Sequence, residues 1–384
     1  MKVADRIKNL PPYVFATVEK RIAAQQAKGV DVISLGIGSP DLKPPQQVID
    51  ALYQSASRDD THGYAGYYGT PALRKAIAGY YERRFGVILD PNTEVRPLIG
   101  SKEGLANMAF AFVDPGDLVL ASDPGYPTYR MGALMAGGDH FPMPLLEEND
   151  YLVDFDLIPN DIADKATLMW LNYPNNPTGA AAPLEFLERA VAFARTHDIV
   201  ICYDNPYCDL CFDGYVAPSI LQIPGAKDVT VEFNSLSKTY NMAGWRVGMA
   251  VGNAQAVDAL TTIKTNIDSG IFRPLQDAAV VALNGDQSWI AERNLIYQRR
   301  RDIILGWLPK LGMSAYMPKG ALYIWAKAPT GQDCEKYAID ILERTGVWMT
   351  PGTAFGDYGN GFLRLSLCVP EARLKEAGER LLKL

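Results

Sequence analysis

The stretch VTVEFNSLSKTYNMAGWRVGMAVG, residues 229 to 252, decides the fold of this chain. Its two ends, 229–234 and 246–252, are apolar runs of the kind that predict buried strands. Between them a single lysine, Lys238, stands among hydroxyl-bearing and small residues. Ligands bind at strand ends in open α/β sheets, so the stretch raises the question of why an amine is placed there.

The rest of the middle of the chain alternates strands and helices. Further strand-like runs lie at 94–100, 117–123, 167–173 and 199–205, and amphipathic segments such as 183–196 lie between several of them. One helix has clear end signals, with Thr70 and Pro71 at its start and Gly86 at its end. This alternation predicts crossover connections and a mostly parallel sheet in an α/β fold.

The length of 384 residues exceeds what one hydrophobic core comfortably supports. After about residue 275 the pattern changes to a long helix over roughly 286–308, a hairpin-like segment at 317–327 and a terminal helix from Pro370. We therefore expect a large domain over 44–285 and a small α+β domain over 286–384. The segment 1–43 belongs to no crossover and is expected to pack with the small domain.

Composition excludes several classes of function. The net charge of −7 argues against a nucleic-acid partner. The odd number of five cysteines indicates free thiols in a reducing compartment, while three scattered histidines argue against a metal site or a Ser-His-Asp triad. No run of eighteen apolar residues and no signal peptide are evident, so we expect a cytoplasmic protein without a membrane partner.

Two polar segments follow predicted strands and have both an ordinary and a functional interpretation. GSKEGL (100–105) opens a helix whose N-terminus could bind phosphate, although Ser101 could equally be a simple N-cap. NYPNNPTG (172–179) reads as a turn, but an asparagine amide there could donate to a ligand oxygen, and an X-Pro bond could be cis.

Two charged residues at strand ends carry the stronger signal. Asp204 in YDNPY (203–207) is either a helix cap or a buried carboxylate, which needs a positive partner, and Tyr207 lies one turn away. Lys238 is either a surface lysine or an amine that attacks a carbonyl group. Together the strand-end features suit an aldehyde on an aromatic cation that also carries a phosphate, which describes pyridoxal 5′-phosphate (PLP).

With these motifs in order along the chain, the sequence resembles the class I/II aminotransferases among the fold-type I PLP enzymes. The resemblance covers essentially the whole chain and implies a large domain with a seven-stranded sheet sandwiched by helices, plus a smaller α+β domain. It implies that Lys238 bonds the cofactor aldehyde and moves the proton, and that Asp204 pairs with the ring nitrogen. Tyr207 and Asn176 match residues bonded to the ring oxygen.

The same resemblance assigns the remaining cofactor contacts. Ser101 and Lys102 match the loop that binds the phosphate through backbone N–H groups. Ser235 and Arg246 match the side chains that bind the same phosphate. Tyr126 in DPGYPTY resembles the aromatic residue that stacks on the cofactor ring.

Substrate contacts come from the two ends of the chain. Arg364 in GFLRLSL (361–367) resembles the arginine that binds the substrate α-carboxylate through a bidentate fork. Gly38 lies in LGIGSPD (35–41), which matches a segment that closes over the substrate. Tyr13, Phe15 and Tyr323 either line the side-chain pocket or simply pack, and Asn176 is expected to contact substrate as well as cofactor.

Two segments that resemble interface regions of the family imply a homodimer with shared active sites. In HGYAGYYG (62–69), Tyr64 matches a tyrosine that reaches the phosphate of the neighbouring subunit, and KTNIDSGIF (264–272) resembles a loop that crosses the interface. The aromatic content of these segments alone would indicate only packing.

Within the family, the segments 6–15, 35–45 and 264–272 look most like LL-diaminopimelate aminotransferases. This implies ping-pong amino transfer between glutamate/2-oxoglutarate and tetrahydrodipicolinate in lysine biosynthesis. An aspartate, alanine or other glutamate-coupled aminotransferase is the main alternative. A PLP-dependent C–S β-lyase is a further alternative, since it would keep the same lysine, aspartate and arginine.

Overall fold

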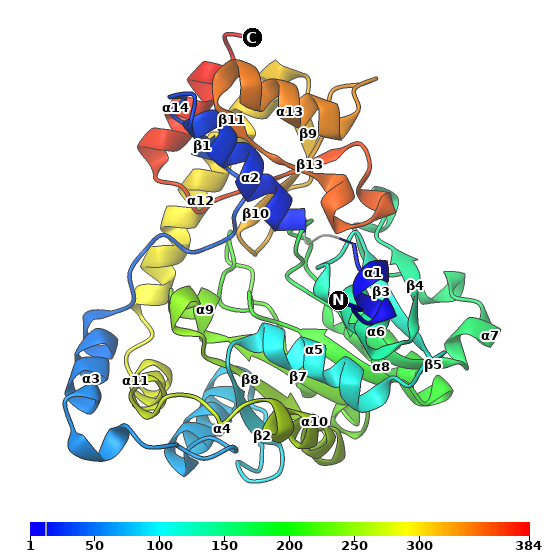
Figure 1. The fold of residues 1–384 in the computed structure, drawn as a ribbon, viewed down its shortest axis with the longest axis vertical. Helices are drawn as coiled ribbons and strands as arrows, with labels where there is room; N and C mark the ends of the chain where they lie inside the picture. The colour runs from blue at the N-terminus through cyan, green and yellow to red at the C-terminus, as the bar shows by residue number, and fades with distance from the viewer. Residues whose placement is uncertain (12–13) are drawn as a thin grey trace.

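The computed structural model describes residues 1–11 and 14–384, which form a large body and a smaller one above it (Figure 1). The large body is built on one sheet, and the long helix α12 (Trp289–Trp307) runs from its edge into the smaller body (Figure 1). None of the described helices is both long and apolar enough to cross a lipid bilayer.

A seven-stranded sheet with the order β2-β8-β7-β6-β5-β3-β4 lies at the centre of the large body. Only β8 runs in the direction opposite to the other strands, so the sheet is mostly parallel, in agreement with the sequence prediction. The strands are β2 (Val95–Leu98), β3 (Leu118–Asp123), β4 (Asp139–Pro144), β5 (Ala166–Leu171), β6 (Val200–Asp204), β7 (Thr230–Ser235) and β8 (Gly248–Gly252).

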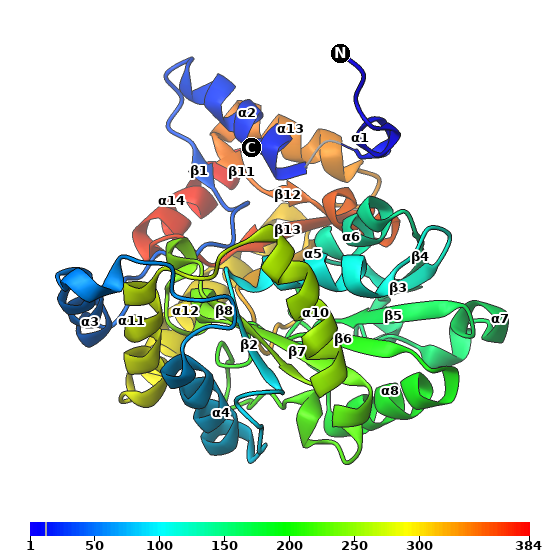
Figure 2. The same cartoon turned by 60° about the horizontal axis from the view of Figure 1, so that its bottom comes forward.

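Helices cover both faces of this sheet, so its central strands are buried on both sides. One face packs against α5 (Ser101–Phe112), α6 (Thr128–Ala136) and α10 (Ala254–Ile267). The other packs against α4 (Pro71–Phe85) and α8 (Leu184–His197), with α3 (Gln46–Ala56) and α11 (Arg273–Asn284) outside α4 (Figure 2).

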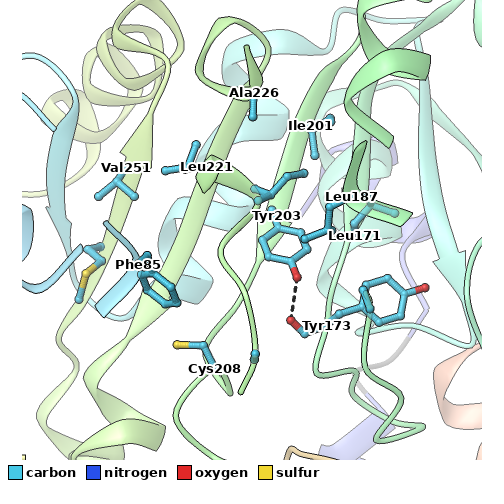
Figure 3. Packing of buried hydrophobic residues seen from close by; sticks show 14 of the residues in the cluster. Phe85, Leu171, Tyr173, Leu187, Ile201, Tyr203, Cys208, Leu221, Ala226 and Val251 are labelled. Atoms are coloured by element: carbon cyan, nitrogen blue, oxygen red, sulfur yellow. Dashed lines mark hydrogen bonds between the residues drawn. The ribbon is translucent and has the colours of Figure 1, made fainter. Parts of the chain in front are cut away.

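Alternation along β6 shows why a strand forms there. Ile201 and Tyr203 face the α8 side of the sheet, where they pack with Leu187 (Figure 3). Cys202, between them, faces the opposite core. The Tyr203 hydroxyl donates to the carbonyl oxygen of Tyr173 at 2.9 Å, so even this buried phenol is satisfied (Figure 3).

The smaller body has its own core and two small sheets. Its four-stranded sheet has the order β12-β13-β10-β9, and β1 pairs in parallel with β11. The elements are β1 (Ile33–Ser34), β9 (Ser314–Ala315), β10 (Tyr323–Lys327), β11 (Val347–Trp348), β12 (Thr350–Pro351) and β13 (Phe362–Ser366), with α2 (Val14–Gln26), α13 (Cys334–Thr345) and α14 (Glu371–Leu381).

Short helices complete the chain. They are α1 (Asp5–Asn9), α7 (Asn160–Ala163) and α9 (Leu236–Thr239), with 3₁₀ turns at η1 (Asp59–Thr61), η2 (Glu147–Asn149), η3 (Phe155–Leu157), η4 (Ile220–Gln222), η5 (Ala226–Asp228), η6 (Ala243–Trp245), η7 (Leu308–Leu311), η8 (Gly352–Phe355) and η9 (Asp357–Gly359). Unlike α2, α1 lies beside α6 of the large body, where Arg6 and Leu10 line a cavity with residues 134–138.

The sequence signals for helix ends are confirmed at α4. Thr70 is its N-cap and accepts from the Leu73 N–H at 3.2 Å, Pro71 is its first residue, and Gly86 ends it in the left-handed conformation. The helix that begins at Ser101 is confirmed as α5, and the alternative interpretation of Ser101 as its N-cap is wrong because Gly100 is in that position. The edge strand β4 was not predicted because its prolines mask the strand pattern.

Candidate active site

The carboxyl ends of four strands bring the polar motifs together at one edge of the large sheet. Asp204 is the last residue of β6 and Ser235 the last of β7. Ser101 opens α5 soon after β2 ends, and Asn176 follows β5. Because β2, β5, β6 and β7 run in the same direction, these residues meet at the same edge.

Arg246 reaches this edge because β8 runs in the opposite direction. It lies just before β8 begins, so it stands where the parallel strands end, and it adopts a left-handed φ of 56°. The helix-entry residue Gly100 makes room for its guanidinium. A Cβ at Gly100 would lie 2.1 Å from Arg246 Nη2, and its φ of 72° is also unfavourable for other residues.

A cavity of about 370 Å³ opens at this edge, between the large sheet and the smaller body. Most of the residues that the sequence singled out line it. They are Gly38, Ser101, Lys102, Tyr126, Asn176, Asp204, Tyr207, Ser235, Lys238, Arg246 and Arg364. The volume lies in the range typical of cofactor and small-molecule sites.

One sequence candidate lies away from this cavity, and another is not among the described residues. Tyr64 is on the surface, with 93% of its area exposed. Tyr13 lies outside the described residues. Tyr64 therefore has no place in the site of its own chain.

Lys238 projects from the short helix α9 toward the N-terminal segment. Ser235 caps this helix by accepting from the Ser237 N–H at 3.2 Å. The Lys238 ammonium donates to the carbonyl oxygen of Gly38 at 2.6 Å and lies 5.9 Å from the centre of the Tyr207 ring. The amine thus reaches across the cavity rather than into solvent.

Asp204 is a buried carboxylate, with 5% of its area exposed. Its Oδ2 accepts from the Tyr129 hydroxyl at 2.7 Å, whereas its Oδ1 has no hydrogen-bond partner among the described residues. Burial raises the pKa of Asp204 to about 7, against the opposing effects of the Tyr129 hydrogen bond and the Lys238 charge. The helix-cap interpretation of Asp204 is therefore wrong.

Arg364 enters the cavity from β13 of the smaller body. One of its nitrogens donates to Asn176 Oδ1 at 2.9 Å and another to the Gly36 carbonyl at 2.5 Å. Its guanidinium carbon lies 4.1 Å from the centre of the Tyr323 ring and 4.5 Å from that of Phe355. The surface interpretation of this arginine is wrong, because only 2% of its area is exposed.

The structure adds Asn172, which sequence reasoning did not place, and it shows that Tyr323 lines the cavity, which the sequence had left open. The side-chain amide of Asn172 donates to the Asp204 carbonyl at 2.6 Å, and its oxygen accepts from the Asn176 N–H at 2.7 Å. The hydroxyls of Tyr323 and Tyr207 lie 3.2 Å apart. Asn172 stands in the NYPNNPTG motif already singled out, whereas Tyr323 could as well have been a packing residue.

Further lining residues carry no signal of their own in the sequence. Glu19 of α2 also borders the cavity, although it is an ordinary exposed residue of an amphipathic helix.

Among the described parts of the chain, no three His, Cys, Asp or Glu side chains gather closely enough to hold a metal ion. The X-Pro bonds before Pro174 and Pro177 in the asparagine motif are both cis.

The residues present fit PLP. Asp204 lines the cavity and its Oδ1 has no hydrogen-bond partner among the described residues, which suits a protonated ring nitrogen. The cations Lys102, Lys238 and Arg246 border the same space, and α5 directs its N-terminus at it, which together suit a phosphate. Arg364 adds a fork for a carboxylate.

Comparison with known proteins gives matches over nearly the whole chain. The model of the family "Aminotransferase class I and II" matches residues 30–381. An LL-diaminopimelate aminotransferase of Dehalococcoides mccartyi is 50% identical over 376 residues, which cover 98% of this chain and 97% of that protein.

Solved structures also superpose on this chain over nearly its whole length. BacF of Bacillus subtilis, with substrate bound, superposes with a TM-score of 0.95 at 38% identity and covers 100% of this chain and 98% of its own. A mutant aspartate aminotransferase of Thermus thermophilus superposes with a TM-score of 0.93 at 29% identity, covering 100% of this chain and 99% of its own.

Proposed function

The chain belongs to the class I and II aminotransferase family, and from this premise we propose that it is an LL-diaminopimelate:2-oxoglutarate aminotransferase of lysine biosynthesis. It is a PLP-dependent enzyme with a fold-type I architecture, and its substrates are amino acids and 2-oxo acids. The observation that carries the specific substrate is the 50% identity to an LL-diaminopimelate aminotransferase over nearly the full length of both chains.

The site residues are proposed to hold the cofactor as their positions around the cavity suggest. Asp204 would pair with the ring nitrogen, and Tyr207 and Asn176 would bond the ring oxygen. Tyr126 would stack on the ring. The phosphate would be bound by four residues, Ser101, Lys102, Ser235 and Arg246, all of which line the cavity.

Bound PLP supplies an aldehyde that bonds an amine and a cationic ring that accepts an electron pair from the substrate α-carbon. Lys238 is the residue that would bond this aldehyde, and its amine would act as the base that takes up the substrate α-proton and gives it back. Arg364 binds and orients the α-carboxylate. Gly38 lies on the segment that covers the substrate and excludes water, and Tyr13 is proposed to contact the substrate side chain.

The reaction is proposed to run as two half-reactions. In the first, an amino acid enters and leaves as its 2-oxo acid, and in the second an incoming 2-oxo acid takes up the amino group. Because one cavity serves both, Arg364 must bind the α-carboxylate of each substrate in turn. Ping-pong kinetics are expected.

The wider organisation follows the same proposal. The enzyme is proposed to be a cytoplasmic homodimer with shared active sites, in which Tyr64 reaches the phosphate of the neighbouring subunit. Its high exposure in the single chain supports this role. The proposed domains are 44–285 and 286–384. The pairing of β1 with β11 supports the proposed packing of segment 1–43 with the latter domain, from which α1 departs because it lies beside α6.

The proposal is tested by assaying the purified protein with PLP. Glutamate formed from 2-oxoglutarate is measured with LL-diaminopimelate, aspartate or alanine as the amino donor, alongside Lys238→Ala. The highest kcat/KM is expected with LL-diaminopimelate, and none with the variant. A higher kcat/KM with aspartate or alanine would overturn the proposed substrate but not the enzyme class, and release of pyruvate and ammonia from a cysteine-like donor would identify a lyase.

A further inference from the structure

Tyr129 forms a hydrogen bond with the buried carboxylate of Asp204. Its hydroxyl donates to Asp204 Oδ2 at 2.7 Å, and Tyr129 does not border the cavity that Asp204 lines. The other carboxylate oxygen, Oδ1, has no partner among the described residues. The two oxygens of one buried carboxylate thus have different environments.

The Tyr129 ring is fixed by its packing. It stacks on Trp170 of β5, with ring centres 4.9 Å apart and an interplanar angle of 7°. Tyr126 packs edge-on against it at 5.8 Å, and only 2% of Tyr129 is exposed. Because the ring cannot turn away, the position of its hydroxyl fixes the rotation of the Asp204 carboxylate.

The charges around Asp204 explain why a donor is needed there. Burial favours the neutral acid, and the Lys238 ammonium and the Tyr129 hydrogen bond favour the carboxylate. The other titratable groups that interact with Asp204 are Tyr207 and Cys202. Burial raises the pKa values of Tyr129, Tyr207 and Cys202 well above their ordinary range, so these groups stay neutral and Tyr129 remains a donor.

We propose that Tyr129 is a positioning residue for the cofactor: its hydroxyl holds Asp204 Oδ2 and thereby turns Oδ1 toward the ring nitrogen. This inference rests on the proposed role of Asp204 as the partner of that nitrogen. Tyr129 itself touches neither cofactor nor substrate, so it acts only through Asp204.

The test measures cofactor binding rather than activity. Apoprotein carrying Tyr129→Phe is titrated with PLP and with 1-deaza-pyridoxal 5′-phosphate, an analogue in which C–H replaces the ring nitrogen. The loss of a hydrogen bond to a charged group is expected to weaken PLP binding about tenfold or more. Binding of the analogue, which cannot pair with a carboxylate, is expected to change little, so the ratio of the two dissociation constants shifts.

If the substitution only removes packing at Tyr129, the binding of both ligands weakens by the same factor and the ratio of the dissociation constants stays unchanged. An unchanged ratio would therefore overturn the proposal. Tyr203→Phe is the matched control, because it removes another buried phenol oxygen one residue from Asp204, on the opposite face of the sheet. Its ratio is expected to equal that of the wild type.

The variant Asp204→Asn tests the proposed role of Asp204 separately from that of Tyr129. If this variant leaves the ratio unchanged, the proposed role of Asp204 fails. If it shifts the ratio and Tyr129→Phe does not, only the inference about Tyr129 fails. In the double variant, Tyr129→Phe is expected to shift the ratio no further, because both changes act through one contact.

Discussion

Replacing Arg293 by methionine is expected to destabilise the protein and to misplace Lys238. Arg293 lies on α12 with 2% of its area exposed, and no carboxylate among the described residues forms an ion pair with it. Its guanidinium instead donates to backbone carbonyls, at 2.9 Å to Lys238 and 2.6 Å to Asp209, and also to Thr239. It therefore joins α12 to the short helix α9, which carries the lysine.

The expected loss in the free energy of unfolding follows from the carbonyl oxygens that no longer receive a hydrogen bond from Arg293. The Asp209 carbonyl keeps a donation from the Asn294 amide at 2.9 Å, so the loss falls mainly on the carbonyls of Lys238 and Thr239. An unsatisfied buried polar group costs about 1–3 kcal/mol, and removing a buried charge returns part of this, so we expect a net loss of about 3 kcal/mol.

Calorimetry of the holoenzyme and steady-state kinetics measure the two effects. The unfolding entropy of a 384-residue chain is about 0.8 kcal/mol/K, so about 3 kcal/mol corresponds to a Tm lower by about 4 °C. A displaced amine is expected to lower kcat about 10- to 100-fold, because small misplacements of a catalytic group are costly.

Arg299→Met on the same helix is the matched control. Arg299 is exposed, and its ion pair with Glu371 at 3.1 Å is a surface one, so its loss is expected to cost less than about 1 kcal/mol and to leave kcat unchanged. Equal changes in Tm for the two variants, or an Arg293→Met enzyme with normal kcat, would refute the reasoning.

Two further predictions concern the core and the substrate segment. Burial raises the pKa of Glu232 from 4.5 to about 7, so the folded state retains a proton that the unfolded state loses, and stability falls as pH rises from 4.5 to 7. The free energy of unfolding is measured by urea denaturation of both apoproteins at pH 4.5 and at pH 7.5. From the lower to the higher pH, the wild type is expected to lose about 3 kcal/mol more of this free energy than Glu232→Gln. The same change with pH in both proteins would contradict this. A Cβ at Gly38 would lie 1.9 Å from the Tyr323 hydroxyl, so Gly38→Ala is expected to lower kcat/KM at least tenfold. Gly306→Ala, where nothing lies within 4 Å, should leave kcat/KM unchanged, and equal losses would argue against the clash.

The sequence alone determined the local elements, because their causes are local. A buried strand needs a short apolar run, and a helix needs its end signals, so the strand β6 and the helix that begins at Pro71 could both be predicted. The strand β4 was not predicted, because Pro142 and Pro144 interrupt the local strand pattern. A strand can contain these prolines only because β4 lies at the edge of the sheet, and the local sequence does not show that position.

The sequence also pointed to the individual chemical groups of the site, through motifs at strand ends and the resemblance to a family. It could not supply the contacts between them. Asp204 and Tyr129 are 75 positions apart, and nothing near either residue indicates that one donates to the other.

Only the tertiary structure decided which of these groups meet. The reversal of β8 brings Arg246 to the edge where the parallel strands end. The packing of α12 brings Arg293 onto the carbonyl of Lys238, and the smaller body delivers Arg364 to Asn176, 188 positions away. Such contacts arise from the order of strands and the docking of two bodies, which are set by burial summed over the whole chain rather than by any local stretch.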